Sequence, residues 1–202
     1  MDFKPWAKHP ALTEQRLATV AAIMRDVRNK AADLHDAAEG DNAWSRGCRV
    51  YARTCFALRR SAAEFDWLSV LPESEALRFT FAVGRVPLKF YRGDASDAPG
   101  HCKIMSDAEA AAQQLLLDLG EIPDDGHLLR LVVESDSEGR TLTVTLIELD
   151  KAGALTGKYV IPSISGTDVI PALARGIDPG PPQIQPLPRV EDRKRRSEGN
   201  GE

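Results

Sequence analysis

Four arginines follow one side of a segment that the sequence predicts to be a helix. At about 100° per residue, they fall within an arc of roughly 60°. They are Arg46, Arg49, Arg53 and Arg60, named here the arginine stripe. No acidic residue occurs from Asn42 to Ala63, so the segment lacks the i,i+4 acid–base pairs common on exposed helices. Because guanidinium groups bind carboxylates and phosphates, the stripe predicts a surface for an acidic protein partner or a nucleic acid.

A second reading of the arginine stripe needs no partner. The arginines would then be solvated, or would pair with acids of the preceding helix, such as Asp26, Asp33 or Asp36. Their position opposite the apolar side of their own helix argues against pairing within a helix pair. The sequence leaves both readings open.

A second basic group surrounds a predicted β-hairpin. Arg78, Arg85, Lys89 and Arg92 lie in or beside it, with Phe90 and Tyr91 between them. Basic residues interleaved with aromatics bind single-stranded nucleic acid by stacking and phosphate contact. Edge strands also carry lysine and arginine to prevent aggregation, and this is the alternative explanation.

Four acids are expected at one end of a later hairpin, if its turn lies at residues 135–139. They are Asp124, Asp125, Glu148 and Asp150. Such a cluster would hold Mg²⁺ or Mn²⁺ and would suit a metal-dependent phosphodiesterase or nuclease. Nucleases of this kind place Glu-x-Lys on the next strand, whereas here Lys151 comes one position late. A solvated acidic rim is the simpler interpretation.

No other pattern predicts catalysis. His9, His35, His101 and His127 share no ligand spacing, the three cysteines form no CxxC pair, and the glycines form no phosphate-binding loop. We therefore predict no catalytic residue, no metal site and no cofactor, and the protein is not expected to be an enzyme. No motif points to a known family.

Two amphipathic helices are predicted to position the arginine stripe. The first spans residues 13–38, with apolar residues spaced by three and four from Leu17 to Ala38. The second runs from about Ala43 to about Val70. Its apolar stripe consists of Trp44, Cys48, Tyr51, Cys55, Leu58, Ala62 and Phe65. We expect the two stripes to pack against each other in an antiparallel hairpin, with Gly47 allowing close approach.

Alternating apolar residues after Pro72 predict strands over residues 77–83, 86–91, 128–134, 141–149 and 155–161. Between them, Ser106 and Glu109 form the capping box of a helix that ends near Leu119. The order ββαβββ behind a helix pair predicts an α+β fold with a mostly antiparallel sheet. The expected domains are 1–71, the helical hairpin, and 77–176, the sheet domain. A disordered tail rich in proline and basic residues follows over 177–202.

Length and composition suit a soluble chain that can bury a core, either as one domain or as a small domain with an appended helical hairpin. The 202 residues are 43% hydrophobic and 28% charged, and the net charge is −4. No apolar run reaches the ~18 residues of a membrane span, and the N-terminus does not resemble a signal peptide. Cysteines that are few and unpaired favour a cytoplasmic setting.

Three functions are consistent with these patterns. The first is a non-enzymatic interaction module that binds an acidic protein or nucleic acid through Arg46, Arg49, Arg53 and Arg60, with Arg85, Lys89 and Arg92 adding positive charge. The second is the metal-dependent phosphodiesterase. The third is a homo-oligomer built through the helices, with Val50, Phe56 and Trp67 forming the second contact.

Overall fold

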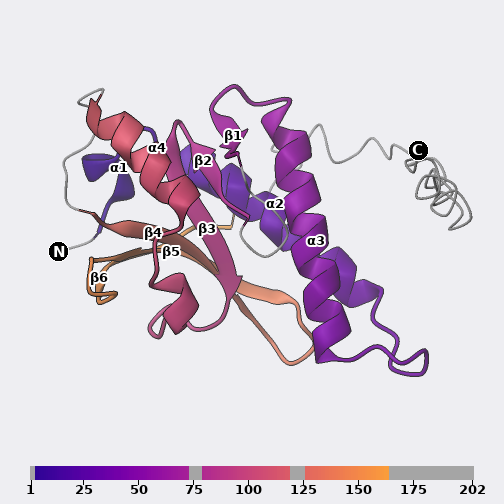
Figure 1. The fold of residues 1–202 in the computed structure, drawn as a ribbon. Coiled ribbons are helices and arrows are strands. Elements are labelled where there is room, and N and C mark those ends of the chain that lie inside the picture. The colour runs from indigo at the N-terminus through magenta and orange to yellow at the C-terminus, as the bar shows by residue number, and fades with distance from the viewer. Residues whose placement is uncertain (1–2, 73–78, 119–125, 164–202) are drawn as a thin grey trace, which may run out of the picture. The chain divides into compact units, whose positions relative to one another are not determined.

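The computed structural model describes residues 3–72, 79–118 and 126–163 (Figure 1). The helices are α1 (Pro5–Lys8), α2 (Glu14–Asp33), α3 (Ala43–Ala62) and α4 (Asp107–Asp118), with a short 3₁₀ helix, η2, at Gly100–Cys102. The strands are β1 (Leu68–Val70), β2 (Phe81–Val83), β3 (Val86–Arg92), β4 (Leu128–Ser135), β5 (Thr141–Leu149) and β6 (Leu155–Val160). The tail expected at 177–202 lies outside the described residues.

The strands form one sheet in the order β1-β2-β3-β4-β5-β6. Among the described strands, only the β3–β4 pair is parallel, and η2 and α4 lie in the connection between these two strands. The other pairs are antiparallel. The prediction of a mixed helix and sheet fold with a mostly antiparallel sheet is confirmed.

Helices cover both faces of the sheet. Successive strand residues point to opposite faces. On β3, Lys89 reaches Glu109 of α4, and the next residue, Phe90, packs on Tyr51 of α3. The helices α3 and α4 therefore lie on opposite sides of the sheet. The two helices α2 and α3 lie side by side (Figure 1), and α2 also contacts β5.

The helix starts follow the sequence signals. The Thr13 hydroxyl accepts the amide of Arg16 at 3.3 Å and caps α2. Asn42 and Ser45 form a capping box at α3. At α4, the Glu109 carboxylate accepts the Ser106 amide at 2.9 Å, and the Ser106 hydroxyl accepts the Glu109 amide at 3.4 Å. The predicted capping box at Ser106 is thus confirmed.

The two helices predicted for the hairpin, which correspond to α2 and α3, are both shorter than expected. The helix α2 ends at Asp33 rather than near Ala38, and α3 ends at Ala62 rather than near Val70. After α3 the chain turns and forms β1, which pairs with β2. The described part of the chain therefore contributes six strands to the sheet, where the sequence predicted five. The strand β1 has only three residues, Leu68, Ser69 and Val70. The spacing of apolar residues over so short a segment does not distinguish a strand from the end of a helix.

The predicted packing of the second apolar stripe is wrong over its first half. Cys55 and Leu58 are buried, but Trp44 is 77% exposed and Cys48 is also exposed. The buried positions of α3 include instead Val50, Thr54, Ala57 and Ser61, a spacing of three and four residues that marks the face toward α2. The first half of the predicted stripe faces an opening beside β3. Gly47 has no atom near its missing side chain, so it does not permit close helix approach.

A buried ion-pair network attaches α4 to the sheet. Arg130 of β4 is fully buried, and its Nη1 donates to Glu109 of α4 at 2.5 Å. The Nε of Arg130 donates to the Cys102 carbonyl at 2.8 Å, and Lys89 Nζ lies 2.7 Å from Glu109 Oε2. Burial by itself raises the pKa of Glu109, but Arg130, Lys89 and the Ser106 amide outweigh it and lower that pKa. The carboxylate is therefore ionised at neutral pH.

Within the described ranges, no helix is both long and apolar enough to cross a membrane.

Candidate functional site

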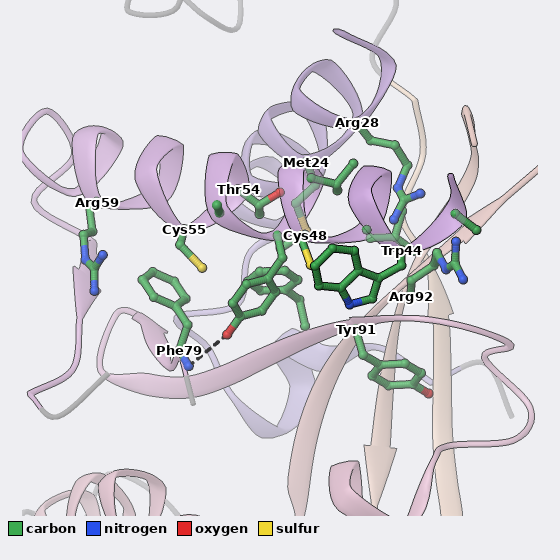
Figure 2. Close-up of a pocket in the computed structure, with 17 residues that line it drawn as sticks. Met24, Arg28, Trp44, Cys48, Thr54, Cys55, Arg59, Phe79, Tyr91 and Arg92 are labelled. Carbon is green, nitrogen blue, oxygen red and sulfur yellow. Dashed lines mark hydrogen bonds between the residues drawn. The ribbon is translucent and has the colours of Figure 1, made fainter. Parts of the chain in front are cut away.

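A groove of about 760 Å³ lies between α3 and β3, with α2 at its base (Figure 2). Its wall on α3 includes Trp44, Gly47, Cys48, Tyr51, Cys55 and Arg59. Phe90 and Arg92 contribute from β3, and Met24 and Arg28 from α2. Ligand sites of small proteins have volumes of this order. The opening is thus large enough for a small molecule or a few side chains of a partner.

Aromatic rings line the middle of the groove. The ring centroids of Tyr51 and Phe90 are 5.4 Å apart, and those of Phe79 and Phe90 are 6.2 Å apart. The Tyr51 hydroxyl oxygen accepts the amide of Phe79 at 3.3 Å (Figure 2). Burial raises the pKa of Tyr51 to about 12, so this hydroxyl is neutral at physiological pH.

Two cysteines contact the groove and differ in accessibility. Cys48 is exposed on α3, whereas Cys55, which lies further along the same helix, is buried. Burial raises the pKa of Cys55 to about 11. A thiol with such a pKa is protonated at neutral pH and is a poor nucleophile. Among the described lining residues, we find no base positioned to activate either thiol.

Positive charge gathers at the Trp44 end of the groove. Figure 2 shows the Trp44 indole beside the guanidinium groups of Arg28 and Arg92. Arg28 is only 5% exposed. Burial, together with the nearby charges of Arg92 and Arg46, lowers its pKa to about 10. Arg28 is therefore a buried cation that lies near other cations.

Arg59 lies at the opposite end of the groove (Figure 2), with its guanidinium carbon 5.1 Å from the centroid of the Phe79 ring. Asp and Glu are absent from the described residues that line the groove. An apolar opening with Arg28 and Arg92 at one end and no acid among its described lining residues is complementary to an anion that carries an apolar group.

The structure does not arrange the arginine stripe as one free surface. Arg49 Nη2 lies 2.9 Å from both carboxylate oxygens of Asp41, and its Nη1 donates to the Leu34 carbonyl at 3.0 Å. Arg46 donates to the carbonyl of Glu138 at 2.7 Å. Arg60 is 4.0 Å from Glu64, and Arg53 is exposed.

The acids considered as partners of the stripe have other contacts. Asp26 pairs with Lys30 at 2.9 Å, and Asp33 with Arg140 at 2.6 Å. Asp41, between the two helices, pairs with Arg49 of the stripe. Hydrogen bonds from the Asp36 amide, Arg49 and Ser45 lower its pKa to about 2.

Of the four basic residues predicted around the first hairpin, Arg78 lies outside the described residues, and the other three lie apart from one another. Lys89 is turned toward α4 and pairs with Glu109. Arg85 occupies the exposed turn between β2 and β3 with a positive φ of 73°. Arg92, at the end of β3, is the member that reaches the groove.

The predicted acidic cluster falls partly outside the described residues, which do not include Asp124 and Asp125. Glu148 lies beside Lys8 and His127 rather than beside other acids, 2.7 Å from Lys8 Nζ and 3.1 Å from His127 Nδ1. The Asp150 carboxylate accepts the amides of Ala152 and Ala154. In the part of the chain that is described, no group of three potential metal ligands occurs.

The residues considered for a helix-mediated oligomer are also separated. Val50 is buried, Phe56 is 66% exposed, and Trp67 stacks on Phe65 with ring centroids 5.0 Å apart. They do not form one exposed apolar contact.

Sequence reasoning did not find the groove, although one signal was present. Arg28 follows Met24 by four residues, so a charged side chain lies on the buried side of α2. A buried arginine requires a partner, and this requirement marks the position as unusual.

No family model matches the chain, and no curated protein or solved structure shows significant similarity to it.

Proposed function

We propose that this protein is a non-enzymatic binding module that takes an acidic segment of a partner protein into the groove between α3 and β3. The observation that supports this proposal is the combination of an apolar groove, the arginines Arg28 and Arg92 at its Trp44 end and no acid among its described lining residues. Charge complementarity of this kind orients a partner and speeds its association.

A protein segment fits these features better than a nucleic acid does. Nucleic-acid surfaces present rows of accessible cations along the phosphate backbone. Here Arg49 and Lys89 are held by Asp41 and Glu109. The exposed indole of Trp44 instead offers a large apolar contact, and tryptophan and arginine are the residue types that contribute most at protein interfaces.

Selection from a random peptide display library tests the proposal. We expect peptides selected on the wild-type protein to carry Asp or Glu within a few positions of an aromatic or aliphatic residue. Trp44→Ala should weaken their binding about tenfold or more, as expected for a central interface tryptophan. Because Trp44 is exposed, this variant should keep the wild-type melting temperature.

Phe56→Ala is the matched control, since Phe56 is an exposed aromatic residue of the same helix that does not line the groove. Its peptide binding should equal that of the wild type. Selected peptides without acids, or equal losses in the two variants, contradict the proposal. A nucleic-acid partner would be favoured instead if no peptides are selected, a single-stranded oligonucleotide binds the wild type, and Arg92→Glu loses that binding.

A further inference from the structure

Arg28 is a buried charge with few partners. It is 5% exposed, and its Nη1 donates to the Gly139 carbonyl at 3.3 Å. Its Nε has no hydrogen-bond partner. A buried guanidinium usually forms an ion pair and satisfies most of its five N–H groups. The end of the groove at Arg28 therefore lacks a counter-charge.

Two more arginines lie close to this charge. Arg46 and Arg92 are near enough for their charges to act on Arg28. The Nη1 of Arg46 is held by the Glu138 carbonyl, and its Nε, like that of Arg28, is buried without a partner. No Asp or Glu of the described chain lies within ion-pair distance of any of these three arginines. Arg28 is buried, Arg46 is half-buried and Arg92 is exposed, and the two neighbours repel the buried charge unless an anion joins them.

The shape of the charged end favours a carboxylate. The Nη1 of Arg28 already donates to the Gly139 carbonyl, so the edge of the guanidinium group that is left for a ligand consists of Nε and Nη2. Two parallel N–H donors match the two oxygens of a carboxylate. Trp44 and Tyr51 line the same groove, so an apolar group next to that carboxylate would contact their rings.

We infer that the Arg28 end of the groove is a carboxylate subsite, which binds an Asp or Glu side chain of the partner segment while a neighbouring apolar side chain covers Trp44. Arg28 anchors the carboxylate, and Arg46 and Arg92 add to its attraction. The inference rests on the proposed function only for the source of the carboxylate, a protein segment.

Phenylbutyrate and its neutral amide, phenylbutyramide, are a matched pair of probes that differ in the charged group. Binding is measured by calorimetry and by the shift of the Trp44 indole N–H resonance. We expect the wild type to prefer the acid by about tenfold or more, equivalent to about 1.4 kcal/mol. In Arg28→Met the preference should disappear, while binding of the amide changes less than about twofold.

Two controls separate this role from folding. Arg28→Met removes a buried charge that has no ion pair, so its melting temperature should equal or exceed that of the wild type. Lys30→Met removes a charge from the same helix outside the groove, where Lys30 is 59% exposed, and should retain the preference for the acid. A preference that survives in Arg28→Met, or that is absent from the wild type, overturns the inference.

The same measurements distinguish this inference from the proposed function. If the selected peptides bind the wild type and Arg28→Met equally, the proposed function stands, but the inference of a carboxylate subsite at Arg28 is overturned. An Arg28-dependent preference for phenylbutyrate, without any selected acidic peptide, would overturn the assignment of the carboxylate to a protein segment. The acidic residue of a selected peptide can also be replaced by its amide. If this replacement weakens binding to the wild type but not to Arg28→Met, it supports both the proposed function and the carboxylate subsite.

Discussion

Glu109 shows how a single buried charge depends on its neighbours. It is 1% exposed, and its carboxylate lies between Arg130 and Lys89. Glu109→Gln should lower the free energy of unfolding by about 3–5 kcal/mol, because it leaves the Arg130 guanidinium buried without an anion. Urea denaturation followed by circular dichroism measures this change.

Asp33→Asn provides the exposed counterpart. Asp33 pairs with Arg140 at 2.6 Å, but the two side chains are 55% and 46% exposed. Water and salt screen such a pair, so its loss should cost at most about 1 kcal/mol. Similar losses in Asp33→Asn and Glu109→Gln would mean that the Glu109 network does not hold α4 to the sheet.

Cys48 offers a test of access to the groove. Among the three cysteines, Cys48 is exposed, whereas Cys55 and Cys102 are buried and have raised pKa values because of that burial. In the native protein at pH 8, iodoacetamide should therefore modify Cys48 much faster than the other two. Peptide mapping by mass spectrometry identifies the site. Equal modification of Cys48 and Cys55 would contradict the described packing of α3.

At the scale of elements, two glycines predict opposite effects. Gly84 begins the β2–β3 turn with φ +54°, and a Cβ there would lie 2.5 Å from the Cβ of Ala11. Gly84→Ala should destabilise the protein by about 2 kcal/mol or more, through both strain and the clash. In Gly47→Ala, the added methyl meets nothing within 4 Å, and the variant should gain up to about 1 kcal/mol from helix propensity.

Thermal melting of the two variants beside the wild type gives both values. A loss of stability in Gly47→Ala would mean that α3 is packed more closely at this position than described. A neutral Gly84→Ala would mean that the turn accepts a side chain and does not lie against Ala11.

Local signals were sufficient for much of the element structure. The Ser106–Glu109 capping box and the alternation along residues 141–149 depend on neighbouring residues, and both appear in the structure. The strand β1 was missed because its three residues become a strand only through pairing with β2. Periodicity does not report such a tertiary contact.

The groove illustrates the same limit across elements. The seven-residue spacing of apolar residues from Trp44 to Leu58 indicates an apolar side of α3, but it does not predict which element packs against that side. Phe90, which faces Tyr51 across the groove, is 39 positions away in the chain. Nothing local in the sequence connects α3 with β3, although the position of Arg28 on the apolar side of α2 pointed to an unusual environment.

At the scale of the whole molecule, the helices and the sheet share contacts that cross the boundary expected near residue 71. All described elements fall within one compact unit, Met1–Ala172. Arg25 of α2 donates to the carbonyls of Ile161 and Pro162, and the Asn29 side chain accepts the amide of Thr141 at the start of β5. These contacts should make the helices and the sheet unfold together.

Hydrogen exchange followed by mass spectrometry at increasing urea concentrations tests this cooperativity. Amides of α2 and α3 should open with the same free energy as those of β4 and β5, within about 1 kcal/mol. Asn29→Ala, which removes the acceptor of the Thr141 amide, should lower both values together. Selective opening of α2 and α3 at lower urea would instead support a separate helical domain, and the groove between α3 and β3 would then be an interface between two domains.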